Sequence, residues 1–139
     1  MPDFDLDPVL VNARHCLTWA AICQHYLQRN PKDDFRQLLV DLLDAEQAAI
    51  SELTHLLRQH DVRPGDLGVF TQLLQQARAR RTDQARMHFI QQGLEHALKW
   101  YAAQAESSDP RLRDLWQRLH DQLVPIENRF SAILSQARQ

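Results

Sequence analysis

Residues 35–57 read FRQLLVDLLDAEQAAISELTHLL, and this stretch decides the fold. Its apolar side chains recur every three or four residues, which is the spacing that places them on one face of an α-helix. The stripe consists of Phe35, Leu39, Leu42, Glu46, Ile50, Leu53 and Leu57. Because one member of the stripe is Glu46, the spacing predicts a carboxylate inside the core of a helix bundle.

A second stripe near the end of the chain repeats this feature. It consists of Trp116, Leu119, Leu123, Glu127, Phe130 and Leu134. An ionised carboxylate inside a core costs several kcal/mol unless a metal, an arginine or a proton neutralises it. Which of these partners neutralises Glu46 and Glu127 is therefore the functional question that the sequence poses.

The composition of the 139 residues indicates one domain, residues 1–139, built from helices, because only 3 glycines and 6 prolines occur. The net charge is -2, from 16 basic and 18 acidic residues, so we expect no nucleic-acid partner. The basic run over residues 78–81 is interpreted as a solvated helix end.

No stretch has the length of a membrane span, and the first twenty residues are acidic rather than signal-like. We therefore expect a cytoplasmic protein without a membrane partner.

Helix-breaking residues divide the chain into elements. The pattern predicts four long helices over residues 8–29, 33–60, 82–107 and 110–137, with Thr82 as a cap and a kink at Pro125. The first and second helices share a short turn, as do the third and fourth, and short turns make antiparallel hairpins. The long connection between the hairpins carries a shorter helix over residues 66–80. The predicted fold class is thus all-α, a four-helix bundle of two antiparallel hairpins joined by a long crossover.

Two further patterns concern pairs of residues. Cys16 and Cys23 are two turns apart on one helix, about 10 Å, so we expect two buried free thiols rather than a disulfide.

An offset of 81 positions pairs His15 with His96, Trp19 with Trp100, and Glu46 with Glu127. The offset indicates an old duplication of one hairpin, although Pro31 and Pro110 are 79 apart.

With this hairpin pattern and its core glutamates, the chain resembles the ferritin-like superfamily, including rubrerythrin-related and small bacterial four-helix proteins, over about residues 8–137. The resemblance implies a ferritin-like bundle. It also implies a di-iron site made of a glutamate on the first helix of each hairpin and Glu-x-x-His on the second. Glu46 and Glu127 match the second-helix glutamates, and Glu95 falls near the third-helix position.

The remaining positions depart from that family pattern. Ala49 and Phe130 stand where the two histidine ligands are expected, and Arg14 stands at the first-helix carboxylate position. Alanine and phenylalanine cannot bind a metal, whereas a guanidinium can bridge carboxylates. The sequence therefore predicts a degenerate di-iron site and a structural cluster of buried charges. Its predicted members are Arg14, Glu46, Glu95 and Glu127.

An alternative hypothesis keeps a metal. Here one transition metal ion, such as iron, manganese or zinc, would bind Glu46, Glu95 and Glu127 with His15 or His96. Glu52 and His55 have the Glu-x-x-His spacing, but Glu52 lies beside the stripe and is expected to face water. The tryptophans and tyrosines are interpreted as core and hairpin-end packing.

For function we expect a non-catalytic, cytoplasmic, ferritin-like protein with a structural or protein-interaction role, no catalytic residues and no cofactor. A homodimer or another protein partner is expected. Its candidate surface is the apolar crossover segment, which could equally pack on its own bundle: Leu67, Val69, Phe70, Leu73 and Leu74. Two alternatives stay open, a metal-binding redox or storage protein and a small-ligand carrier that uses the bundle interior.

Overall fold

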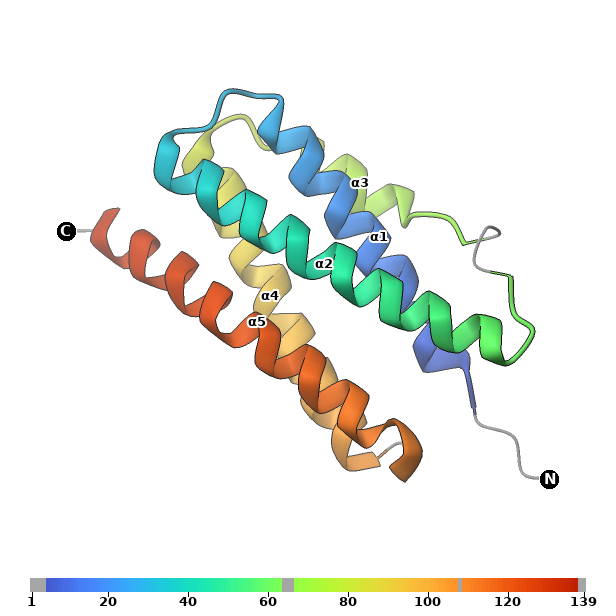
Figure 1. The fold of residues 1–139 in the computed structure, drawn as a ribbon. Helices are drawn as coiled ribbons and strands as arrows, with labels where there is room; N and C mark the ends of the chain where they lie inside the picture. Colours follow the sequence, from blue (N-terminus) through green and yellow to red (C-terminus); the bar gives the residue numbers. More distant parts are fainter. Residues whose placement is uncertain (1–4, 64–66, 108, 138–139) are drawn as a thin grey trace.

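The computed structural model describes residues 5–63, 67–107 and 109–137, and every regular element in these ranges is an α-helix (Figure 1). The all-α prediction is confirmed. The helices are α1 (Asp7–Leu27), α2 (Asp33–Gln59), α3 (Thr71–Arg78), α4 (Asp83–Ser107) and α5 (Pro110–Ala137). The four long helices lie within two residues of the expected ranges. The helix in the crossover is shorter than expected, and residue 66, its expected start, lies outside the described residues.

Local chemistry explains where the helices begin and end. Pro8 lies in the first turn of α1, where its missing N–H has no helical partner to lose. Asn30 and Asp61 follow α1 and α2 with φ angles of 53° and 61°, a conformation that short polar side chains tolerate. Thr82 caps α4 as expected, because its hydroxyl accepts a hydrogen bond from the Ala85 N–H at 3.1 Å. The helix α5 continues through Pro125.

The helices form two antiparallel hairpins, α1 with α2 and α4 with α5, as Figure 1 shows. The hairpins pack together mainly through α2 and α5, while α3 lies along α1. Over the described residues, α1 and α4 have far less backbone contact than any of these pairs. The largest fully buried side chains of the core include Trp116, Tyr26, Phe35, Phe130 and Ile22.

The crossover packs against its own bundle rather than standing free. Leu67, Leu73 and Leu74 are half-buried against the core. The Phe70 N–H donates a hydrogen bond to the Thr18 hydroxyl at 2.9 Å, and the Tyr26 hydroxyl donates to the Ala77 carbonyl at 2.7 Å. The two contacts fix both ends of α3 to α1, so the apolar crossover residues have a structural explanation within one chain.

Cys16 and Cys23 are both free and buried, as expected. None of the described helices combines the length and the apolar character needed to cross a lipid bilayer.

Candidate functional site

A cleft of about 620 Å³ opens between α1 and α4. Helix α3 forms one edge of the cleft, and Glu46 of α2 lies at its floor. The walls include four large aromatic side chains, Trp19 from α1 and Phe89, Trp100 and Tyr101 from α4. The cleft exists because the two hairpins meet along α2 and α5, which leaves α1 and α4 apart.

Two side-chain bridges hold α1 and α4 at this separation. At one bridge, Trp19 packs against Phe89 with ring centroids 5.6 Å apart, and its indole lies over Gly93. At the other, the Tyr101 hydroxyl donates a hydrogen bond to Asn12 Oδ1 at 3.0 Å. Trp19 and Asn12 are seven residues apart on α1, about 10 Å along the helix axis. The open space between the two helices is therefore braced at two levels.

Glu46 is the charged group of the cleft floor, with 6% of its surface exposed. Burial raises the pKa of Glu46 from 4.5 to about 7, because an ionised carboxylate loses its hydration, and a hydrogen bond with Cys16 lowers this pKa only in part. In return, burial and the neighbouring Glu46 carboxylate raise the pKa of the Cys16 thiol well above its usual range. Glu46 therefore gains or loses its proton near neutral pH, while Cys16 stays a thiol.

Asn12, Cys16 and Tyr101 complete a polar cluster beside Glu46. Cys16 Sγ lies 3.9 Å from the Tyr101 hydroxyl oxygen, and burial raises the pKa of the Tyr101 phenol. Asn12 is 5% exposed, and its Nδ2 has no hydrogen-bond partner within the part of the chain that the structure describes. Asn12 also lines the cleft, so the residue that carries this unpartnered donor borders the space.

The predicted cluster of Arg14 with three glutamates is not assembled. Arg14 faces the crossover, where its Nε donates to the Gly68 carbonyl at 3.3 Å and its guanidinium lies 4.1 Å from the centroid of the Phe70 ring. No ion pair joins Arg14 to Glu46, Glu95 or Glu127, all of which lie in the described ranges. The structure therefore does not bring these four side chains together.

The physical reason is a difference of one residue in register. Ala13 and Leu94 take the core positions on α1 and α4, so the residues that follow them, Arg14 and Glu95, are turned away by about 100°. Glu95 is exposed and accepts a hydrogen bond from Gln91 Nε2 at 2.6 Å.

Glu127 also differs from its repeat partner. It is half-buried and accepts hydrogen bonds from the Ser131 hydroxyl at 2.7 Å and from Gln91 Nε2 at 3.2 Å. Gln91 thus links Glu127 to Glu95, while Glu46 stays apart on the other hairpin. Glu127 is therefore stabilised by neutral hydrogen-bond donors and not by the Arg14 charge that was expected from the sequence.

The alternative metal site is likewise not assembled. Across the described ranges, no three histidine, cysteine, aspartate or glutamate side chains lie close enough to hold a metal ion. His15 and His96 both line the cleft, but the His15 ring packs on Phe70 with centroids 4.5 Å apart. Burial, and then the Arg14 charge, lower the pKa of His15.

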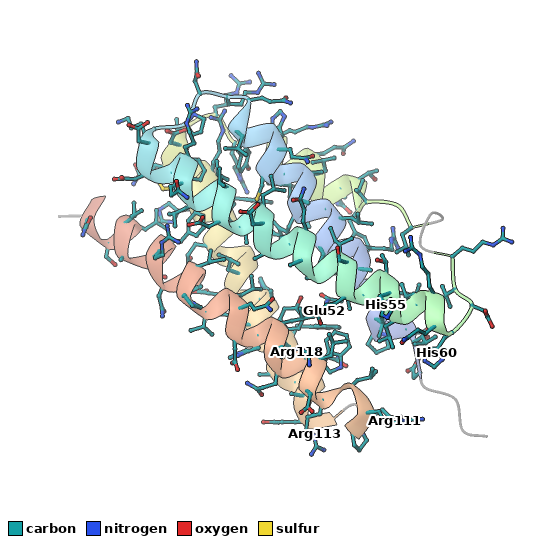
Figure 2. All side chains as sticks on the ribbon, viewed as in Figure 1. Glu52, His55, His60, Arg111, Arg113 and Arg118 are labelled. Carbon is teal, nitrogen blue, oxygen red and sulfur yellow. The ribbon has the colours of Figure 1, made fainter. Side chains whose placement is uncertain are left out.

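The Glu52–His55 pair belongs to the surface between α2 and α5. Figure 2 shows Glu52 directed toward Arg118, which donates a hydrogen bond to its carboxylate at 2.9 Å. His55 is exposed and contacts Gln59 at 3.2 Å. Glu52 is thus half-buried beside a charge partner rather than fully in water, and it does not contribute to the cleft.

The polar partners of Glu46 were not predicted from the sequence. Asn12 and Cys16 are four residues apart and precede Trp19, so the three lie on one face of α1. That spacing was a usable signal, since a polar residue aligned with a cysteine and a tryptophan is unusual on a core-facing stripe. The aromatic residues were interpreted as packing alone, although Trp19 and Trp100 also form walls of the cleft.

Comparison with known proteins adds no relative to this description. No protein-family model matches the chain, and neither a curated protein nor a solved structure matches it.

Proposed function

We propose that this is a non-catalytic binding protein whose cleft between α1 and α4 holds one small organic molecule. The observation that carries the proposal is the cleft itself, about 620 Å³, with four large aromatic side chains in its lining, Glu46 at its floor and further polar side chains around it. Small-molecule sites in proteins typically occupy about 300–1,000 Å³ and combine apolar walls with a small number of placed polar groups.

The unpartnered polar atom at the floor supports a ligand in this space. A buried donor without a bond costs about 1–3 kcal/mol, and such donors are rare in folded proteins. Asn12 lines the cleft, and a bound molecule with an acceptor atom that reached its Nδ2 would remove this cost. Glu46 adds a second polar group at the same floor, and its raised pKa is typical of binding sites.

The chemistry of the floor favours binding over covalent catalysis. A cysteine attacks as a thiolate, and the environment of Cys16 raises the pKa of its thiol. Tyr101 already donates its proton to Asn12, and the neighbouring His15 ring packs against Phe70 instead of Cys16. These features support the non-catalytic assignment.

The proposal includes a ferritin-like arrangement and a cytoplasmic location. Support for the arrangement comes from the two antiparallel hairpins and from the crossover, which returns along the bundle so that α2 and α4 run in the same direction (Figure 1). A homodimer remains a separate prediction, and light scattering of the purified protein tests it.

The ligand-binding proposal is tested by filling the cleft. Ala97 lines it, whereas Ala102 on the same helix is exposed and does not line it. Dansylamide, an uncharged dye that fluoresces in apolar surroundings, serves as the probe. We expect the parent and Ala102→Trp to bind dansylamide and Ala97→Trp to bind it at least about 10-fold more weakly, about 1.4 kcal/mol.

Circular dichroism establishes that both variants keep the helical content of the parent. Equal binding by Ala97→Trp and the parent would place the dye elsewhere and would overturn the proposal, as would a parent that binds neither dansylamide nor a charged dansyl dye. Native mass spectrometry of the purified parent is the complementary measurement, and a co-purified small molecule that is absent from Ala97→Trp is the supporting result.

A further inference from the structure

We infer that the preferred ligand of the cleft is a protonated organic amine, with its cationic nitrogen at Glu46 and its apolar body between Trp19 and Trp100. This inference rests on the proposed function and adds the chemical class of the ligand. Its three supports are the missing countercharge of Glu46, the nature of the walls, and the distribution of charge at the rim.

The first support is that Glu46 faces no basic side chain among the described residues. From α1 it is approached by Cys16 and, at longer range, by Cys23, and both thiols have a raised pKa and stay neutral. From α4 it is approached by the neutral phenol of Tyr101. On the α5 side of Glu46, the lining residues carry no charge: Leu119, Gln122 and Leu123.

An ionised carboxylate in this position needs a countercharge, and the described residues supply none. Burying an ionised group without a partner is costly, whereas a charged donor bonded to a carboxylate makes one of the stronger hydrogen bonds in proteins. An ammonium group that enters from the cleft would supply both the charge and the donor. An anionic ligand would instead place like charges together at the floor.

The second support is the aromatic lining. Trp19, Phe89, Trp100 and Tyr101 all line the cleft, and tryptophan faces attract cations more strongly than other aromatic side chains do. The same faces offer apolar area for the body of the ligand. Walls of this kind combined with one carboxylate are suited to a molecule that is part cation and part hydrocarbon.

The third support is that the rim does not favour anions over cations. Its titratable groups are His15 from α1 and Glu95, His96 and Lys99 from α4. Lys99 and Glu95 are both exposed and oppose each other in charge, and the lowered pKa of His15 favours its neutral form. The buried Glu46 therefore decides the sign of the ligand charge.

The affinity for an amine should depend on pH in the same way as the ionisation of the Glu46 carboxylate. Amine binding requires ionised Glu46, whose pKa is about 7 because of burial. Affinity for an amine with a pKa well above 8 should therefore rise between pH 5.5 and pH 8. A neutral ligand of the same shape should show no such rise.

Three dansyl dyes test the ligand class: dansylcadaverine, which carries an ammonium group, neutral dansylamide, and dansylglycine, which carries a carboxylate. At pH 8 the parent should bind dansylcadaverine at least about 10-fold more tightly than dansylamide, equivalent to about 1.4 kcal/mol, and dansylglycine most weakly. Glu46→Gln keeps the shape of the side chain and should remove this preference. Glu95→Gln removes a carboxylate at the rim and should leave it intact.

The outcomes separate the two proposals. If dansylamide binds as tightly as dansylcadaverine, and Ala97→Trp abolishes both, the amine inference is overturned while the proposed function stands. A preference that survives in Glu46→Gln and disappears in Glu95→Gln also overturns it, because the rim would then be responsible. If none of the three dyes binds the parent, the proposed function fails together with the inference.

Discussion

The indole ring of Trp19 lies where a side chain at residue 93 would be. A Cβ atom added to Gly93 would collide with Cζ2 and Cη2 of the Trp19 indole, and would lie 3.2 Å from Cε2. Glycine is usually unfavourable inside a helix, by about 1 kcal/mol relative to alanine, so its presence in α4 needs a packing explanation. The close approach of Trp19 to α4 supplies that explanation, and both residues line the cleft.

Gly93→Ala should therefore destabilise the protein despite the better helix propensity of alanine. Overpacking typically costs about 1–3 kcal/mol, which exceeds the gain of about 1 kcal/mol in propensity. Chemical denaturation measures the change, and tryptophan fluorescence should shift as the indole moves. Gly68→Ala is the matched control, because its Cβ would meet no atom within 4 Å, and it should be neutral or slightly stabilising. A Gly93→Ala protein as stable as the parent, with unchanged fluorescence, would contradict this packing.

Glu46→Gln should change how stability depends on pH. The pKa of Glu46 is raised from 4.5 to about 7, so the folded state binds more protons than the unfolded state between these values. The contribution of Glu46 is therefore most favourable below pH 4.5 and declines as the pH rises to about 7, by a total on the order of 3 kcal/mol at about 1.4 kcal/mol per pH unit. Denaturation of the parent and the variant at pH 5 and pH 8 measures the difference.

Measuring the parent and Glu46→Gln side by side separates the effect of Glu46 on stability from the effects of the other groups that titrate in this range. His15 and His25 have lowered pKa values and make stability rise with pH, in both proteins alike. Relative to the parent, Glu46→Gln should gain stability at pH 8 compared with pH 5. Parallel pH profiles for the two proteins would show that Glu46 is not buried as described.

Tyr101→Phe should destabilise the bundle, because it leaves Asn12 Oδ1 without the hydrogen bond of 3.0 Å that it now accepts. The expected cost is about 1–3 kcal/mol for an unpartnered buried group. Asn12→Leu should also be destabilising, since it removes the acceptor. The double variant Asn12→Leu, Tyr101→Phe should lose less than the sum of the single losses, because both polar groups then disappear together. Strict additivity would show that the two side chains do not interact.

The sequence predicted helix positions well because helix boundaries are set locally. Breakers such as Asn30 with Pro31, and the cap at Thr82, act over three or four residues, and the structure has helix ends close to all of them. The buried position of Glu46 was also predictable, since one apolar stripe on α2 is enough to determine which side faces the core.

The partners of Glu46 could not be predicted, because they depend on how separate helices are rotated against each other. On α1 and α4 the expected register was displaced by one residue, which is enough to turn a side chain by about 100°. Arg14 and Glu95 therefore moved out of the expected cluster, and Asn12 and Tyr101 formed the contact that no single-helix pattern contains. The cleft has the same origin, because a gap between two helices depends on contacts between the other pairs.

Thr18→Val should loosen the crossover from the bundle. The Thr18 hydroxyl donates to the Arg14 carbonyl at 2.7 Å and accepts from the Phe70 N–H at 2.9 Å, so it joins α1 to the residue before α3. Valine keeps the shape but leaves the Phe70 N–H without this acceptor, at an expected cost of about 1–3 kcal/mol. Amide hydrogen exchange at Phe70 should accelerate, and because α3 forms one edge of the cleft, dansylamide affinity should fall as well.

Thr54→Val is the matched control for this prediction. Within the described ranges, the Thr54 hydroxyl bonds only to carbonyl groups of its own helix, those of Ile50 at 2.8 Å and Ser51 at 3.2 Å. Its replacement leaves no N–H without a partner, so the stability change should stay within about 0.5 kcal/mol and the dye affinity should not change. Equal losses in the two variants would mean that the threonine hydroxyl on α1 does not hold the crossover, and that α3 is fixed by the Tyr26 contact to Ala77 instead.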